Sequence, residues 1–376
     1  MLKNVPSPCN RLRYSDFIHT FVGSKNTFTH PAMQQDNEQS PLTMKDLARM
    51  LGVSVATVSR ALRDSPSISK QRREAIQQFA LEQNFRPNIV AETLRNSRRA
   101  PIKVIGVIVP QFVHYYFATV LTGIEQEASS RGYRLLVACS GEDEAREAQL
   151  CDDFYRNRVC GIIVAQSKHT VHYDHFVTLA QHKMPLVFYD RICPAINANR
   201  VVVDDYKGAF KAVSYLVERG CRRIAYYGAS LNLEIAVNRL NGYKDALYQH
   251  GLTPDPELIK LCDNRGDAEL ITPALLERSD RPDAFFAVND ETAIGILYTA
   301  KRMGLRVPEE LMICGFSSSN TATLCDPQLT SVEQNGLEVG REAADMLIGM
   351  VEGTLTADHA QKRIVRTRLV VRETTR

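Results

Sequence analysis

The sequence predicts two folds in one chain: an all-α helix-turn-helix domain, followed by an α/β domain of two lobes with two parallel sheets. Three observations support this prediction. At 376 residues, the chain is too long for one ordinary core. Short helical segments with capping residues follow one another from Thr43 onward. Beyond residue 102, apolar strand-like runs alternate with helical segments, which is typical of parallel sheets covered by helices on both faces.

The first 41 residues differ from the rest of the chain. They are rich in Asn, Gln, Ser and Thr and have no helical or strand periodicity. We therefore expect residues 1–41 to form a disordered N-terminal extension. The sequence leaves open whether translation begins at Met1 or at Met33.

Residues 42–87 are predicted to form a three-helix DNA-binding domain. Thr43 and Ser54 can cap the first two helices, because their hydroxyls accept hydrogen bonds from free backbone N–H groups. The helices are expected between Thr43 and Gly52, over 55–62, and between Ser69 and about Asn84. The apolar positions of the third helix are Ile76, Phe79 and Ala80. Pro87 ends the domain.

The positive charge of the chain is concentrated in this region. Residues 41–100 hold eleven Lys and Arg against five Asp and Glu, a net charge of +6, whereas residues 101–376 hold 31 against 35. A localised basic segment is what binding to phosphates requires. It favours a DNA-binding domain over the alternative, a small helical hairpin with incidental arginines.

The start of the second helix carries the candidate DNA contacts. A helix fits the major groove with its N-terminal residues at the base edges. Arg60 can bind guanine through two hydrogen bonds, whereas Val55 and Ala56 offer only apolar contact, as to a thymine methyl. The remaining candidates for DNA contact, mainly through phosphates, are Thr43, Ser54, Thr57 and Ser59.

Residues 88–101 are predicted to form a hinge helix and a linker. Asn88 can cap a short amphipathic helix in which Ala91 and Leu94 lie on one side. Residues 96–101 are basic and lack apolar anchors, as expected of a linker.

The α/β domain is predicted over residues 102–376, with eight apolar strands. The lobes are expected to divide into about 102–205 with 332–362, and about 206–331 with 363–376. The predicted strands are Val104–Val109, Leu135–Cys139, Gly161–Val164, Leu186–Tyr189, Val201–Val203, Arg223–Tyr227, Ala284–Val288 and Leu311–Gly315.

Polar and aromatic side chains that follow these strands are the candidate ligand contacts, because ligands of parallel sheets bind beyond the carboxyl ends of the strands. Together they suit a polyhydroxylated or heteroaromatic small molecule. For each residue the alternative is loop capping or a structural ion pair. The candidates are Tyr116, Phe117, Asp190, Arg191, Arg239, Asn289, Asp290 and Ser317.

Other functional classes find no support in the sequence. The histidines at 169, 172, 175 and 182 lack metal-ligand spacing, so we predict no metal site and no cofactor. GFSSS (315–319) lacks the final glycine of a nucleophile elbow, and we predict no enzyme activity. The chain has no membrane-length apolar run and no signal-like N-terminus. Its nine cysteines form no CxxC pair. We therefore expect a cytoplasmic, nucleoid-associated protein.

The sequence resembles the lactose-repressor/galactose-repressor family of bacterial transcription regulators. The resemblance covers about residues 42–372. It is carried by the order of several motifs: TMKDLARMLGVSVATVSRAL (43–62), IKVIGVIVP (102–110), VVVDDYKGAF (201–210), AFFAVNDETAIGIL (284–297), GLRVPEEL (304–311) and LTSVEQN (329–335).

The resemblance implies a periplasmic-binding-protein-like sensor and a homodimer that binds a palindromic double-stranded DNA operator. It assigns base reading to Val55, Ala56 and Arg60. It also assigns minor-groove insertion to Leu94, with Asn88 as cap and Ala91 between subunits. Effector contact is implied for Tyr116, Phe117, Arg239 and Asn289. The absence of a C-terminal leucine heptad predicts a dimer without further assembly.

Two departures from the family pattern bear on the effector. Ser317 stands where many sugar-binding relatives have aspartate, and the loop 230–237 is apolar where purine-binding relatives are polar. The first departure removes a carboxylate that would bind pairs of sugar hydroxyls, whereas the second disfavours a purine, so a sugar or sugar phosphate remains the expected effector. The alternatives are an extracytoplasmic sugar-binding protein, which leaves residues 43–100 unexplained, and a sugar-handling enzyme, which lacks a catalytic constellation. The sequence leaves open whether the effector releases or enhances DNA binding. It also leaves open whether the protein represses or activates transcription.

Overall fold

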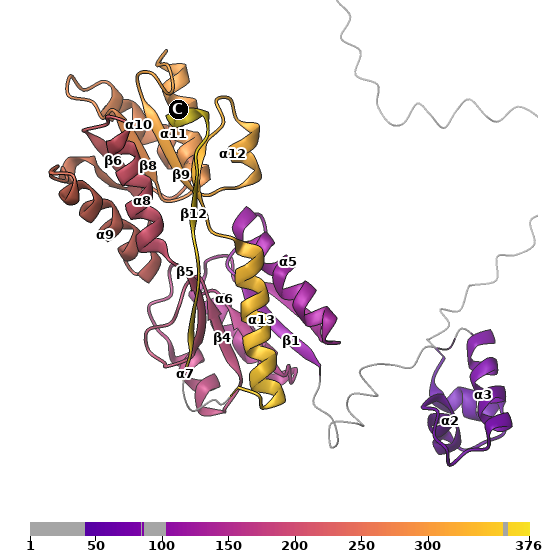
Figure 1. The fold of residues 1–376 in the computed structure, drawn as a ribbon. Coiled ribbons are helices and arrows are strands. Elements are labelled where there is room, and N and C mark those ends of the chain that lie inside the picture. The colour runs from indigo at the N-terminus through magenta and orange to yellow at the C-terminus, as the bar shows by residue number, and fades with distance from the viewer. Residues whose placement is uncertain (1–41, 84, 86–102, 356–359) are drawn as a thin grey trace, which may run out of the picture. The chain divides into compact units, whose positions relative to one another are not determined.

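The computed structural model describes residues 42–83, 85, 103–355 and 360–376 (Figure 1). The predicted extension 1–41 and the predicted hinge contacts Asn88, Ala91 and Leu94 lie outside the described residues. The chain divides after Leu94 into two units, which we call the head and the sensor and describe separately.

The head contains three helices, as predicted: α1 (Met44–Met50), α2 (Val55–Leu62) and α3 (Lys70–Glu82). Thr43 and Asp46 form a reciprocal capping box at the start of α1. The turn between α1 and α2 passes through Gly52 at φ +64°, a backbone conformation that glycine adopts without steric cost. The core consists of Leu47, Ala48, Val58, Ala61, Ile76, Ala80 and Phe85. Phe79, expected to be buried, is only partly covered.

The first lobe of the sensor is a six-stranded parallel sheet in the order β11-β5-β4-β3-β1-β2. Helices α5 and α13 cover one face, and α6 and α7 cover the other. The strands are β1 (Val104–Val109), β2 (Arg134–Cys139), β3 (Gly161–Val164), β4 (Leu186–Tyr189), β5 (Asn199–Val203) and β11 (Lys362–Val365). The helices are α5 (Tyr115–Ser130), α6 (Glu144–Arg156), α7 (Asp174–Gln181) and α13 (Gly336–Glu352).

The second lobe repeats this plan in the order β12-β10-β9-β8-β6-β7, with only β12 antiparallel. The strands are β6 (Ile224–Gly228), β7 (Ile259–Leu261), β8 (Ala284–Ala287), β9 (Met312–Ser317), β10 (Thr330–Glu333) and β12 (Arg368–Val370). The helices are α8 (Asp205–Glu218), α9 (Glu234–Gln249), α10 (Arg265–Leu276), α11 (Asp290–Arg302) and α12 (Asn320–Leu324), with 3-10 turns η1 (Pro256–Leu258) and η2 (Glu373–Thr375).

The two parallel sheets and all eight apolar strands were correctly predicted. The strands β7, β10, β11 and β12 were missed, because they are short and carry polar residues. Two lobe boundaries also move. β10 belongs to the sheet of the second lobe, so the chain returns to the first lobe after Glu333 and not at about residue 332. β11 pairs in parallel with β5, so the chain changes lobe after Val365 and not at about residue 362.

Helices α5 and α13 lie side by side on the first lobe (Figure 1). Glycines make this close approach possible. A Cβ atom at Gly340 of α13 would lie 2.0 Å from the Val120 carbonyl oxygen, and one at Gly123 of α5 would lie 2.1 Å from the Leu337 carbonyl oxygen. The packing of α13 matters for the sensor because this helix follows a crossover from the second lobe, at residues 334–335.

Candidate DNA-binding helix and effector cleft

Helix α2 buries one face in the head and exposes the other. Val58 and Ala61 are fully buried, whereas Ala56 and Arg60 are exposed. Ser54 starts the helix: its hydroxyl accepts a hydrogen bond from the Thr57 backbone N–H at 3.1 Å. Ala56 and Arg60 are therefore accessible to solvent, as contact with a DNA groove would require.

The other predicted DNA contacts differ in accessibility. Arg60 donates from Nε to the Ala56 carbonyl at 3.2 Å, so its guanidinium is directed toward the start of α2. Val55 is half-buried and packs against the head's core. The Thr43 hydroxyl is bound to Asp46. Ser59 is only 9% exposed, which leaves little of it accessible to a phosphate, contrary to the sequence-based expectation.

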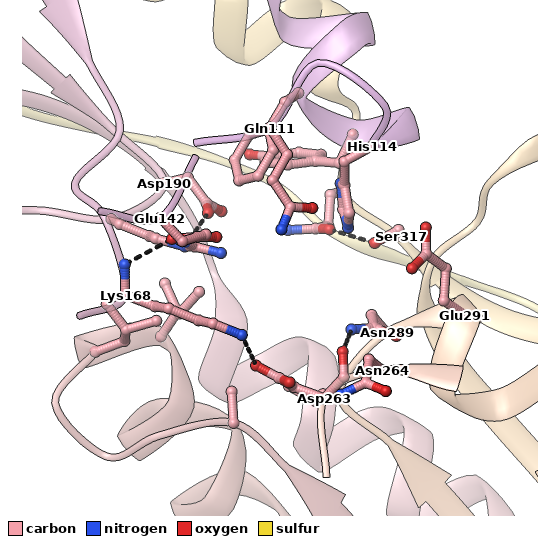
Figure 2. Close-up of a pocket in the computed structure, with 18 of the residues that line it drawn as sticks. Gln111, His114, Glu142, Lys168, Asp190, Asp263, Asn264, Asn289, Glu291 and Ser317 are labelled. Carbon is pink, nitrogen blue, oxygen red and sulfur yellow. Dashed lines mark hydrogen bonds and ion pairs between the residues drawn. The ribbon is translucent and has the colours of Figure 1, made fainter. Parts of the chain in front are cut away.

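The sensor has a cavity of about 120 Å³ lined by residues of both lobes, which we call the cleft (Figure 2). It lies where the carboxyl ends of the two sheets meet, as the rule for parallel sheets leads one to expect. The structure brings together at the cleft the predicted residues Tyr116, Phe117, Asp190, Arg191, Arg239, Asn289 and Ser317.

Asp290 is the exception among the predicted effector contacts, because it does not line the cleft. It is 2% exposed, and its carboxylate accepts hydrogen bonds from the Ser319 backbone N–H at 2.6 Å and from the Ser331 hydroxyl at 2.5 Å. Burial raises the pKa of Asp290 to about 6. Asp290 therefore ties α11 to β10 and to the loop after β9, and the expectation of effector contact is corrected.

Arg239 projects from α9 and is 4% exposed. Its guanidinium donates to the Asp205 carboxylate at 2.7 Å and to the Val288 carbonyl at 2.6 Å, and it lies 3.7 Å from the centre of the Phe316 ring. Burial raises the pKa of Asp205 to about 7 although Arg239 acts to lower it. The guanidinium is thus held rigidly, which suits a group that orients a ligand.

Four groups of the first lobe line the cleft with unused hydrogen-bonding capacity. The Tyr116 hydroxyl, the Asp190 Oδ1 atom, the His114 Nδ1 atom and the Arg191 Nε atom are buried without a hydrogen-bond partner among the described residues. Burial raises the pKa of Asp190, and the nearby Arg191 and Arg239 oppose that shift. Burial, reinforced by repulsion from Arg191, lowers the pKa of His114 to about 4. Buried polar atoms without partners are costly, so these atoms favour a polar ligand in the cleft.

Ion pairs arrange the charged side chains of the cleft. Arg191 Nη1 lies 2.8 Å from both carboxylate oxygens of Glu142, within the first lobe. Lys168 Nζ of the first lobe lies 3.1 Å from Asp263 Oδ2 of the second. Figure 2 shows the Lys168–Asp263 pair spanning the cavity.

On the second lobe, Asn289 joins two elements. Its side chain caps α11 by accepting from the Thr292 backbone N–H at 2.8 Å, and it donates to the Asp263 carbonyl at 2.7 Å. Ser317 donates to Gln334 Oε1 at 2.8 Å, which links β9 to the crossover after β10. Both side chains line the cleft and are held by neighbours before any ligand arrives.

The sequence reasoning missed part of the lining. Glu142 and Lys168 follow β2 and β3 by three and four residues, so they would have been predicted if more residues after each strand had been considered. Asp263 and Asn264 follow β7, a strand too short to be predicted. Leu233 and Ile235 belong to the apolar loop 230–237, which the sequence had already connected with the effector. The missed lining residues are Gln111, His114, Glu142, Lys168, Ala229, Asp263, Asn264, Val288, Glu291 and Gln334.

Among the described residues, no group of three or more His, Cys, Asp or Glu side chains is arranged to hold a metal ion. His172 pairs with Glu144 and His175 with Glu147, both within the first lobe. Within the same residues, no helix is long and apolar enough to cross a membrane.

Family models match both parts of the chain. Residues 43–88 match the model of bacterial regulatory proteins of the lacI family, and residues 213–375 match that of a periplasmic binding protein-like domain. The HTH-type transcriptional repressor CytR of Escherichia coli K12 is 31% identical over 345 residues, covering 92% of this chain and 99% of CytR. The predicted resemblance is confirmed.

Solved structures agree on the fold. The complex of the regulator CelR with cellobiose is 26% identical with a TM-score of 0.67, covering 89% of this chain and 99% of CelR. The lac repressor dimer bound to operator and anti-inducer is 22% identical with a TM-score of 0.78 over the same shares. The relatives named here are transcription regulators rather than enzymes. From its helix-turn-helix head, its two-lobed sensor and these relatives, the chain belongs to the LacI family of bacterial transcription regulators.

Proposed function

We propose that the protein is a homodimeric repressor that binds a palindromic operator through α2, and that a sugar-class effector in the cleft sets its operator affinity. The observation that carries the proposal is the cleft itself. It collects aromatic, cationic and carboxylate side chains from both lobes around buried polar atoms without partners. A ligand that contacts both lobes can favour one arrangement of the sensor over another, which is the basis of population shift.

Operator reading is tested by comparing Arg60→Ala with Arg72→Ala. Arg60 is exposed at α2, and its loss is expected to cost about 1–3 kcal/mol of binding, mainly at one base pair. Arg72 is exposed on α3 and is expected to contact phosphate only, so its loss weakens binding to all sequences equally. Binding to a randomised duplex library distinguishes the two patterns. Uniform weakening by Arg60→Ala would contradict base reading.

The hinge adds a second DNA contact to the proposal. By family resemblance, Leu94 enters the minor groove at a deformable central step, with Asn88 and Ala91 shaping the hinge helix. These residues lie outside the described part of the chain, so the proposal rests on the sequence. Leu94→Ala should reduce both operator affinity and DNA bending. Unchanged affinity and bend would remove this role.

A dimer is supported by exposed apolar side chains in the loop between β1 and α5. Phe112 is 55% exposed and Val113 is 95% exposed, just before α5. A palindromic operator also needs two heads, because one small head binds weakly. Val113→Asp is expected to shift the protein to monomer in sedimentation experiments. The matched control is Leu270→Asp, which places the same charge at a 78% exposed leucine on α10.

The effector class is supported by the CelR–cellobiose complex and by the polar lining of the cleft. A thermal-shift screen of sugars tests it, because a ligand stabilises the state that it binds. A sugar bound in the cleft should lose affinity on Tyr116→Phe, which removes only an unpartnered hydroxyl. Tyr189→Phe is the control, since the Tyr189 hydroxyl is also unpartnered but does not line the cleft.

The site of action follows from operator binding: we expect the protein in the cytoplasm, at the nucleoid. The relatives, which are DNA-binding repressors, support this expectation. An exported sugar-binding protein or a sugar-handling enzyme would have no use for the head, and a salt-sensitive gel shift separates both from the proposal.

A further inference from the structure

Each lysine and arginine that lines the cleft already has a carboxylate partner. Lys168 pairs with Asp263 at 3.1 Å, and Arg191 with Glu142 at 2.8 Å. Arg239 pairs at 2.7 Å with Asp205, which does not line the cleft. The positive charges of the cleft are therefore neutralised before a ligand arrives.

Two carboxylates of the cleft have unused capacity. Asp190 is 4% exposed; its Oδ2 atom lies 3.9 Å from Arg191 Nε, and its Oδ1 atom has no hydrogen-bond partner among the described residues. Glu291 is exposed at the rim near Ser317 (Figure 2), and the structure gives its carboxylate no ion pair within the described chain. The lining thus contains four acidic residues against three basic ones: Glu142, Asp190, Asp263 and Glu291 against Lys168, Arg191 and Arg239.

The helix ends around the cleft add little attraction for an anion. Helices α9, α10 and α11 begin at the cavity, and each has an acidic side chain in its first turn. Such side chains offset the positive end of the helix dipole. The first turn of α5 has no acidic residue, but its N-cap is His114, which its low pKa of about 4 keeps neutral at physiological pH.

We propose that the cleft takes a sugar without an anionic group, neutral or amino, whose O–H or N–H groups donate to Asp190 and Glu291, and that it excludes sugar phosphates. This inference rests on the proposed function and narrows its ligand class. A phosphate in the cleft would face the Asp190 and Glu291 carboxylates. Lys168 could bind it only by breaking the ion pair with Asp263, which leaves a carboxylate uncompensated. Arg191 Nε has no hydrogen-bond partner in the described part of the chain, but it lies 3.9 Å from Asp190 Oδ2, so a phosphate bound there would lie beside that carboxylate.

The exclusion is tested with inorganic phosphate as the probe, titrated into the full-length protein at constant ionic strength. We expect no saturable binding that depends on the cleft. The variant Asp263→Asn with Glu291→Gln frees Lys168 and removes one repelling carboxylate, so phosphate affinity should rise about tenfold or more. The matched control is Glu277→Gln with Glu309→Gln, which removes the same charge from exposed positions outside the cleft.

Two results would overturn the inference. One is saturable phosphate binding by the wild type that Arg191→Gln abolishes. The other is a double cleft variant whose phosphate affinity equals that of the control pair. The thermal screen provides a further test, in which the neutral, amino and phosphorylated forms of one sugar are compared, for example glucose, glucosamine and glucose 6-phosphate. A preference for the phosphorylated form contradicts the inference. Operator binding is measured separately by gel shift. Failure of the proposed function is therefore distinguishable from failure of the inference about the ligand's charge.

Discussion

Lys168 and Asp263 form an ion pair across the effector cleft, with Nζ 3.1 Å from Oδ2. Lys168 follows β3 of the first lobe and Asp263 follows β7 of the second. A second inter-lobe pair, Lys362 with Glu234 at 3.3 Å, lies outside the lining of the cleft. The lobes are therefore joined by charges as well as by the three crossovers of the chain.

Lys168→Met should loosen the lobes without unfolding them. Both side chains of the pair are 24% exposed, so the stability lost should be about 1 kcal/mol or less. The mean separation of the lobes should increase, which small-angle X-ray scattering measures. Arg306→Gln is the control, because it breaks an ion pair of 2.9 Å within the second lobe. Equal scattering from both variants would mean that the pair does not hold the lobes.

Arg239→Met should destabilise the sensor strongly. It leaves the Asp205 carboxylate, which is 2% exposed, without its cationic partner, at a cost of about 3–5 kcal/mol. Urea denaturation measures this loss. Adding Asp205→Asn should restore part of it, since the buried charge is then gone. A double variant as unstable as the single one would show that the packing of Arg239 against Phe316 dominates.

Asp290 should make the stability of the sensor depend on pH. Its pKa in the folded protein, raised by burial, is about 6 against 3.8 in the unfolded chain. The folded state therefore favours the protonated form. The stability from this group is fully present below about pH 4 and is lost as pH rises through 6.

The test compares wild type with Asp290→Asn from pH 4 to 7.5. The unfolding free energy of the wild type, relative to that of the variant, should fall by up to about 3 kcal/mol as pH rises through this range. Asp326→Asn, at a side chain that is 95% exposed, should follow the wild type at every pH. A pH-independent difference for Asp290→Asn would refute the assignment.

Gly340→Ala should disrupt the packing of α5 on α13. The added Cβ would lie 2.0 Å from the backbone oxygen of Val120, so one helix must shift, at a cost of about 1–3 kcal/mol. Gly266→Ala in α10 meets nothing closer than 3.5 Å and should be neutral or stabilising, because alanine favours helix. Thermal unfolding of the two variants gives the comparison.

Much of the fold was predictable because its determinants are local. The caps Thr43 and Ser54 set the starts of α1 and α2 within a few residues, and the apolar runs of β1, β3 and β4 match the observed strands residue for residue. The strands β7, β10, β11 and β12 were not predictable in this way. Their pairing depends on sheets assembled from distant segments, and their residues do not form long apolar runs.

The cleft was predictable only in part. Asn289 and Asp290 are neighbours after β8, and the sequence treats them alike. The structure separates them: Asn289 lines the cleft, whereas Asp290 is used to bind Ser319 and Ser331. Which of two neighbouring side chains after a strand faces the ligand depends on the elements that pack around the end of that strand. A single sequence does not contain that information.

The helix-turn-helix head, the alternation of strands and helices, and the family could be recognised from the amino-acid sequence, because capping and hydrophobic periodicity act over a few residues. Which charged side chains pair with each other depends on contacts between distant segments. Lys168 and Asp263 are 95 positions apart in the sequence, and Arg239 and Asp205 are 34 positions apart. The first pair depends on how the three crossovers bring the two sheets together, and the second depends on the packing of α8 against α9, so the chemistry of the cleft is a property of the folded sensor.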